Sequence, residues 1–262
     1  MELSKLIAAL FCAVLVAACS RDPPSVREGM KLGAAALREG DLAKAEDLYT
    51  ATFHMADKVG NESYAVFAGD YAADVALMRD APGRALKLYE RMTERYPEML
   101  RNVAGRMRIP NNLAVLLARD GRIEEGMKVL EEALARYEGH GVSPAYPFAP
   151  RAFLTGNLVR MHARHSWDPR SEALLQSTLA WLERDVDLDR SGQFTHGAHA
   201  LFKALGDFAS GGPRPGEAAR LYARAEEAAA RADSHDQPAD RKLCEPRAED
   251  LAKTESCYEV YE

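Results

Sequence analysis

One arrangement of small, bulky and turn-forming residues occurs three times along the sequence. In the first occurrence a small residue, Ala45, precedes a bulky one, Tyr49, by four positions. The corresponding pairs further along are Ala85 with Tyr89 and Gly126 with Leu130. The three small residues follow one another at intervals of 40 and 41 residues. Such an interval is the signature of a repeat protein, in which each unit buries its apolar face against its neighbours.

Each repeat has the composition of two helices joined by a turn. Alanine is abundant, glycine and proline lie mostly between periodic segments, and alternating β-branched runs are absent. These features predict an all-α chain. Gly40 and Gly121 are expected to end the first helix of their repeats in the left-handed conformation. Small residues such as Gly33 and Ala114 would let the two helices of a pair approach closely.

The pattern resembles the tetratricopeptide repeat (TPR). The residues in register are Leu32, Gly33, Gly40, Ala45 and Tyr49 in the first repeat; Ala73, Ala85, Tyr89 and Pro97 in the second; and Leu113, Ala114, Gly121, Gly126, Leu130 and Ala133 in the third. The resemblance implies a right-handed α-solenoid of stacked helix-turn-helix units. It is strong over residues 27–138 and weaker over 150–232, where two degenerate units are expected. The period exceeds the usual 34 or so, which predicts longer helices or an extra turn.

The amino terminus has the features of an export signal. Lys5 precedes an unbroken apolar run from Leu6 to Ala18, which is 13 residues long. A helix of that length rises about 20 Å, too little to cross a hydrocarbon core of about 30 Å. The run ends at Cys19 and a polar, proline-containing stretch follows at once. These features fit the apolar region of a cleaved signal peptide.

The segment from Val16 to Cys19 resembles the lipobox of bacterial lipoproteins. The resemblance implies cleavage before Cys19 and lipidation of its thiol, and Ser20 in the next position favours the outer membrane, facing the periplasm. A true membrane anchor or an ordinary secretory signal is the alternative. The expected organisation is a signal peptide at 1–18, a lipidated tether at 19–26, TPR-like repeats at 27–232 and a tail or cap at 233–262.

Charge and cysteine content narrow the possible partners and compartment. The formal net charge of −6 argues against a nucleic-acid surface. Cys244 and Cys257 would remain after lipidation, and an even pair in an exported protein suggests a disulfide. Two free thiols are the alternative.

A concave surface is the best candidate for a binding site. In TPR proteins the inner faces of the first helix of each pair line a groove that takes a peptide or a partner's helix. Projected onto this chain, the groove residues are Met30, Lys31, Arg38, Asp70, Tyr71, Asp74, Asn111, Asn112 and Arg119. Asparagine could bridge a peptide backbone, and Arg38 and Arg119 could hold a carboxylate. Met78 and Val115 could share this face or belong to the core.

Other chemistry has weaker support. The pairs His162/His165 and His196/His199 could each share a helix face, but no third-ligand spacing accompanies them. Asp185, Asp187 and Asp189 alternate without the glycine and glutamate of a calcium loop. No GxSxG motif or phosphate-binding glycine loop occurs. We therefore expect no metal, no other cofactor and no enzymatic activity.

The sequence thus favours a lipid-anchored protein-protein interaction scaffold of the cell envelope, in envelope assembly, secretion or pilus biogenesis. The alternative is a solute- or glycan-binding lipoprotein that uses the aromatic residues Tyr146, Phe148, Trp167 and Trp181. The identity of the partner and the oligomeric state stay open.

Overall fold

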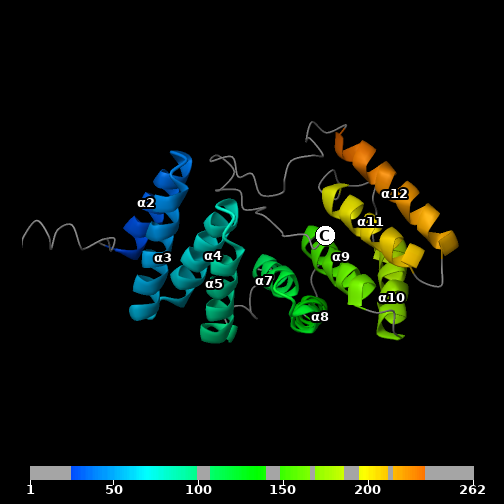
Figure 1. The fold of residues 1–262 in the computed structure, drawn as a ribbon, viewed down its shortest axis with the longest axis horizontal. Coiled ribbons are helices and arrows are strands. Elements are labelled where there is room, and N and C mark those ends of the chain that lie inside the picture. The colour runs from blue at the N-terminus through cyan, green and yellow to red at the C-terminus, as the bar shows by residue number, and fades with distance from the viewer. Residues whose placement is uncertain are drawn as a thin grey trace, which may run out of the picture. The chain divides into compact units, whose positions relative to one another are not determined.

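The computed structural model describes residues 25–98, 107–139, 148–165, 169–185, 195–211 and 215–233. Every regular element within these ranges is a helix, which confirms the predicted all-α class of helix-turn-helix repeats (Figure 1). The helices are α2 (Val26–Arg38), α3 (Leu42–Lys58), α4 (Glu62–Met78), α5 (Pro82–Arg95), α7 (Arg108–Arg119), α8 (Ile123–Gly139), α9 (Phe148–His165), α10 (Pro169–Asp185), α11 (Thr195–Gly211) and α12 (Pro215–Asp233). Predictions about the signal peptide, Cys19, Cys244, Cys257 and the tail beyond Asp233 lie outside the described residues.

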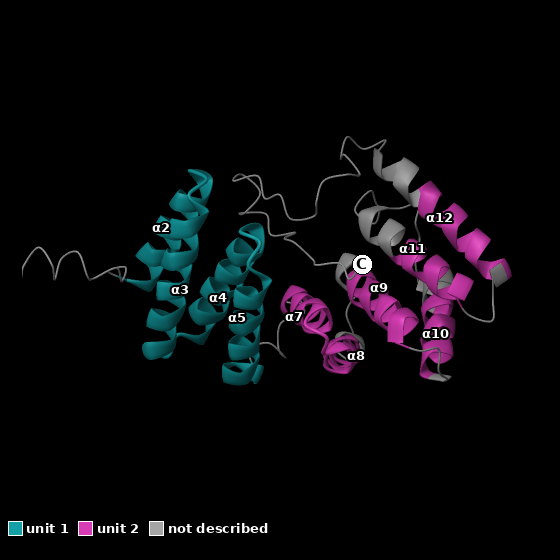
Figure 2. Cartoon of the chain, in the orientation of Figure 1, with its two compact units in different colours: residues 1–99 teal, residues 100–262 magenta. Residues whose placement is uncertain are grey.

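The chain divides into two compact units, residues 1–99 and residues 100–262 (Figure 2). Unit 1 contains α2 to α5, and unit 2 contains α7 to α12. The boundary falls between the second and third repeats of the sequence.

Local capping explains where the helices of unit 1 begin. Side-chain oxygens of Ser25, Asp41 and Asn61 accept hydrogen bonds from backbone N–H groups three residues ahead, at 3.1, 3.1 and 3.3 Å. These bonds satisfy helix-end donors that have no partner inside the helix. α5 begins instead with Pro82, whose ring fixes a helical φ and whose missing N–H costs nothing there.

The turns within helix pairs have the predicted left-handed residue. Gly40 has φ 77° between α2 and α3, and Gly121 has φ 87° between α7 and α8. Asp80 takes the same place between α4 and α5, with φ 54°. Glycine was therefore correctly predicted at two of these turns, and an aspartate takes its role at the third.

Close helix approach depends on the small residues that the sequence pattern singled out. A Cβ added to Gly33 would lie 2.7 Å from the Tyr49 ring, and one added to Gly126 would lie 2.6 Å from the carbonyl oxygen of Ala114. Tyr49 is 2% exposed and fills the space between α2, α3 and the next pair. The predicted packing of a small residue against a bulky one is confirmed at these positions.

Unit 2 departs from a simple series of hairpins around α9. α9 packs more extensively against α11 than against α10. The apolar core here joins Val159 of α9, Leu175 of α10 and Leu201 and Leu205 of α11. The degenerate sequence pattern over this region therefore accompanies a different helix pairing.

The last pair, α11 and α12, is a regular repeat that the sequence pattern had marked as degenerate. A Cβ on Gly206 would lie 2.8 Å from the Tyr222 ring, which reproduces the contact of Gly33 with Tyr49. Both pairs are separated by 16 residues. Gly206 was missed because its distance from the other repeats is irregular, although counting back from Tyr222 would have found it.

Candidate functional site

Three basic residues form a stripe along one exposed face of α2. Lys31 and Arg38 were predicted groove residues, and Arg27, which was not, lies one turn before Lys31. The spacing of four and then seven residues puts all three on one helix face. Within the described part of the chain, none of the three makes an ion pair. Met30, also predicted, is half-buried beside them.

α4 presents an acidic and aromatic face. The predicted residues Asp70, Tyr71 and Asp74 are all half-buried. Phe67, one turn earlier on the same face, is 46% exposed, which is unusual for so large an apolar side chain. Sequence reasoning missed Phe67, although its place three and four residues before Asp70 and Tyr71 was visible.

Tyr49 of α3 connects the faces of α2 and α4. Its ring stacks on Tyr71, with centroids 5.2 Å apart and planes inclined by 18°. Burial raises the pKa of the Tyr49 phenol, and Tyr71 raises it further; Arg38 opposes this effect, and Asp74 adds to it more weakly. Three predicted residues, Arg38, Tyr71 and Asp74, thus gather around Tyr49. We call the surface formed by Lys31, Arg38, Phe67, Asp70, Tyr71 and Asp74 the α2–α4 face.

Tyr89 of α5 lies beneath the α2–α4 face and contacts two of its carboxylates. Its hydroxyl is placed to donate to Asp70 at 3.4 Å and to Asp74 at 3.3 Å. Tyr89 is fully buried. The two carboxylates are therefore held by a rigid side chain.

The predicted groove residues of α7 divide into buried and exposed. Asn111 and Asn112 are fully buried, and their side chains form a chain of hydrogen bonds with Asn157 of α9. Val115 belongs to the core. Arg119 is exposed. A partner could reach Arg119, whereas contact with the two asparagines would require the surrounding helices to open.

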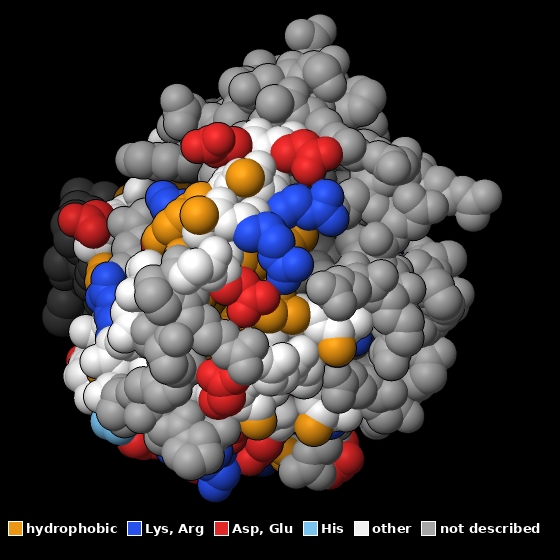
Figure 3. Space-filling view, turned by 90° about the vertical axis from the view of Figure 1, so that its right-hand side faces the viewer, with side chains coloured by type: hydrophobic (Ala, Val, Ile, Leu, Met, Phe, Trp, Pro, Cys, Tyr) orange, Lys and Arg blue, Asp and Glu red, His pale blue; other side chains and the backbone are white. Residues whose placement is uncertain are grey.

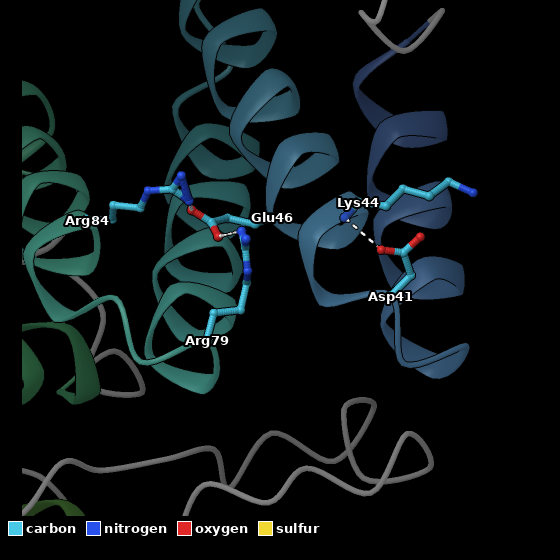
Figure 4. A network of polar contacts seen from close by, with 5 residues as sticks. All are labelled: Asp41, Lys44, Glu46, Arg79 and Arg84. Carbon is cyan, nitrogen blue, oxygen red and sulfur yellow. Dashed lines mark hydrogen bonds and ion pairs between the residues drawn. The ribbon is translucent and has the colours of Figure 1, made fainter.

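A buried carboxylate that the sequence reasoning missed links the first two repeats. Glu46 of α3 is 5% exposed and accepts hydrogen bonds from Arg79 and, at 2.7 Å, from Arg84 (Figure 4). Two arginines offset the cost of removing one carboxylate from water. This group of one carboxylate and two arginines has a structural role, because the Glu46 carboxylate faces the two helices of the next repeat.

The same helices are joined at two further points. Arg91 lies over the ring of Phe53, 5.2 Å from its centroid, and Arg95 donates to Asp57 at 3.0 Å. Glu46–Arg84, Phe53–Arg91 and Asp57–Arg95 are each separated by 38 residues. We call these three contacts the α3–α5 seam; the common interval, close to the repeat period, is the signal that could have revealed it.

The described residues hold no cluster of three or more metal-binding side chains. His162 is buried and contacts Ser171 at 3.0 Å, while His165 lies 2.5 Å from Glu124, so the structure does not bring these two together as ligands. His196 and His199 lie on α11, but their side chains are outside the described set. The same holds for the side chains of Phe148, Trp181 and Asp185, while Tyr146, Trp167, Asp187 and Asp189 fall between the described ranges.

The surface shown in Figure 3 carries basic, acidic and apolar side chains interspersed. On α12, Arg220 and Arg224 pair with Glu217 and Glu227 on the same helix. Such exposed pairs are ordinary solvated surface. Among the helices that the structure describes, none is long and apolar enough to span a membrane.

Comparison with solved structures places the fold in a known class. A kinesin light chain from Podosopora anserina with nearly identical TPR-like repeats aligns over 83% of this chain and 99% of its own, with a TM-score of 0.58 and 16% identity. A point variant of that protein aligns over 81% and 97%, with a TM-score of 0.55 and 16% identity. No protein-family model and no curated protein matches the chain. The chain thus has the fold of a TPR-like helical repeat protein.

Proposed function

We propose that the chain is a lipid-anchored scaffold of the cell envelope that recruits a protein partner through the α2–α4 face. The observation that carries the proposal is the chemistry of this face. Lys31 and Arg38 of α2 are exposed and make no ion pair among the described residues. Tyr71 of α4 stacks on Tyr49, whose pKa both Arg38 and Asp74 influence, and Phe67 of α4 is exposed. A face with both signs of charge around an aromatic centre suits a peptide that has to bind in one orientation.

The contacts beneath this face reduce the cost of binding. Tyr49 packs on Tyr71, and Tyr89 holds Asp70 and Asp74. Side chains already fixed in the free protein lose little conformational entropy when a partner arrives. A preorganised, charged and partly apolar surface is typical of a recognition site.

The proposed anchor would keep this face close to a membrane. Six residues separate Cys19 from Val26, the first residue of α2. Fully extended, they span about 20 Å. A lipid on Cys19 would therefore hold the first repeat near the membrane surface, and we propose the periplasmic side of the outer membrane.

Partner capture from cross-linked envelopes tests the scaffold. The tagged wild-type chain should recover a specific protein, and a Lys31→Glu, Arg38→Glu double variant should lose it. Lys58→Glu, at an exposed lysine at the end of α3, is the matched control for charge reversal. Equal recovery by all three forms would contradict the proposed face.

Metabolic labelling with a clickable fatty acid tests the anchor separately. Wild-type protein should incorporate label, and Cys19→Ala should not. Unlabelled wild-type protein would remove the anchor and its location from the proposal, while leaving the repeat face to be judged by partner capture.

A further inference from the structure

In two of the helix pairs, a tyrosine of the second helix donates a hydrogen bond to an aspartate of the first helix. Tyr89 donates to Asp74 at 3.3 Å in the pair α4–α5. Tyr222 donates to Asp207 at 2.7 Å in the pair α11–α12. The two residues are 15 positions apart in both cases. The bond is therefore a recurring element of these repeats.

The first repeat has the tyrosine but lacks the aspartate. Tyr49 is the equivalent tyrosine, and Ala34 occupies the position 15 residues before it. The ring is seated as in the last repeat, because Gly33 and Gly206 approach Tyr49 and Tyr222 almost equally, at 2.7 and 2.8 Å. An aspartate at position 34 would consequently be placed to accept from the Tyr49 hydroxyl.

The Tyr49 hydroxyl is a donor for which the described part of the chain offers no acceptor. No hydrogen bond joins it to any residue in the described ranges. It is not among the fully buried unpaired oxygens found there, so its tip reaches solvent although 98% of the residue is covered. Arg38 lies one helical turn after Ala34 on α2, so it shares the face that carries position 34, and it has no ion pair within the same ranges.

We infer that the Tyr49 hydroxyl and the Arg38 guanidinium bind a carboxylate of the partner, which takes the place of the aspartate found in the other two pairs. The inference rests on the proposed scaffold function and names the chemistry of its ligand. A carboxylate accepts hydrogen bonds from both groups at once, and the arginine bond is charge-assisted. The carboxylate comes from an aspartate or glutamate side chain or from a chain terminus.

Acetate serves as the minimal probe of this site. The mature chain carrying Cys19→Ala and isotope-labelled tyrosine and arginine would be titrated with acetate and, as the uncharged control, acetamide. Acetate should shift the NMR signals of Tyr49 and Arg38 in a saturable way, and acetamide should not. N-acetylglycine and N-acetylglutamate amide then distinguish a terminal carboxylate from a side-chain carboxylate.

Two variants remove the site in different ways. Tyr49→Phe deletes the donor, and Ala34→Asp supplies the missing acceptor from within the chain. Both should weaken acetate binding at least about tenfold. Ala34→Asp should keep the fold, since it recreates the bond of the other pairs, and Tyr222→Phe is the matched control that should leave acetate binding unchanged.

The outcomes separate the two proposals. Wild-type Tyr49 signals that do not respond to acetate, or equal binding by Ala34→Asp and wild type, would overturn the carboxylate site. Partner capture that persists in that case would leave the scaffold proposal standing. A response to acetate without any captured partner would support the site and contradict the scaffold.

Discussion

Arg95 donates from Nε to Oδ1 of Asp57 at 3.0 Å, and this bond joins the last turn of α5 to the last turn of α3. The Tyr96 hydroxyl donates to the same oxygen at 2.5 Å. The hydrogen bond from Tyr96, and after it the one from Arg95, lowers the pKa of Asp57. Burial, together with the hydrogen bond to Asp57, raises the pKa of Tyr96 to about 12. The ionised form of Asp57 is thus favoured in the folded protein.

The contribution of Asp57 to stability should disappear in acid. A carboxylate whose folded pKa is lowered stabilises the protein above its unfolded pKa, near 3.8, and loses that effect as the pH falls through the folded value. Urea denaturation should show Asp57→Asn less stable than wild type from pH 7 to about pH 5. The difference should shrink below pH 4 or so. A deficit that stayed constant into strong acid would show that the charge is not responsible.

Neutralising Glu46 should destabilise unit 1. Glu46→Gln removes the charge that two arginines surround, and we expect a loss of about 1–3 kcal/mol, because the arginines are partly exposed and water screens them. Asp47→Asn changes the neighbouring exposed carboxylate and should alter stability by less than about 0.5 kcal/mol. The unfolding free energies of the two variants in urea provide the comparison, and similar losses would mean that the buried network adds nothing specific.

Adding one methyl group at Gly33 should disturb the first helix pair. The new Cβ would meet the rigid Tyr49 ring, so Gly33→Ala should cost about 1–3 kcal/mol. Gly83, in the first turn of α5, has open space around its Cβ position. Gly83→Ala should therefore stabilise the chain by up to about 1 kcal/mol through a higher helix propensity. Thermal unfolding of both variants tests this difference in sign.

The turn between α4 and α5 should be improved by glycine. Asp80 has φ 54°, a conformation that is unfavourable for most residues and that glycine adopts freely. Asp80→Gly should raise the unfolding free energy by up to about 1 kcal/mol, and Gly40→Ala in the equivalent turn should lower it by about the same amount. The melting temperatures of the two variants and the wild type, measured by calorimetry, test these opposite changes. A lower melting temperature for Asp80→Gly would show that the Asp80 side chain stabilises the turn.

The fold was predictable from sequence because the repeat imposes local rules. The glycine turns at Gly40 and Gly121 and the packing of Tyr49 on Gly33 follow from short-range spacing. The turn at Asp80 was located correctly, but Pro82 starts α5 so early that Gly83 lies inside the helix. Spacing alone could not show that α9 pairs mainly with α11, because helix partners far apart in sequence leave no periodic signal.

The placement of the candidate site residues was predictable only in part. Position in a repeat correctly placed Lys31 and Arg38 on an exposed face. The same reasoning assigned Asn111 and Asn112 to the groove, yet Asn157, 46 residues after Asn111, donates to the Asn111 side chain in the interior, and Asn111 donates in turn to Asn112. Contacts between helices depend on tertiary structure. The hydroxyl of Tyr49, which has no acceptor among the described residues, could therefore be recognised only when three helix pairs were compared.

The α3–α5 seam has a mechanical consequence. Its three contacts lie along two helices that run in the same direction, so a force that slides one helix past the other would strain all three together. Contacts loaded in parallel yield at a higher force than contacts broken one after another. The first two repeats should therefore behave as one stiff segment when one helix is pulled along the other.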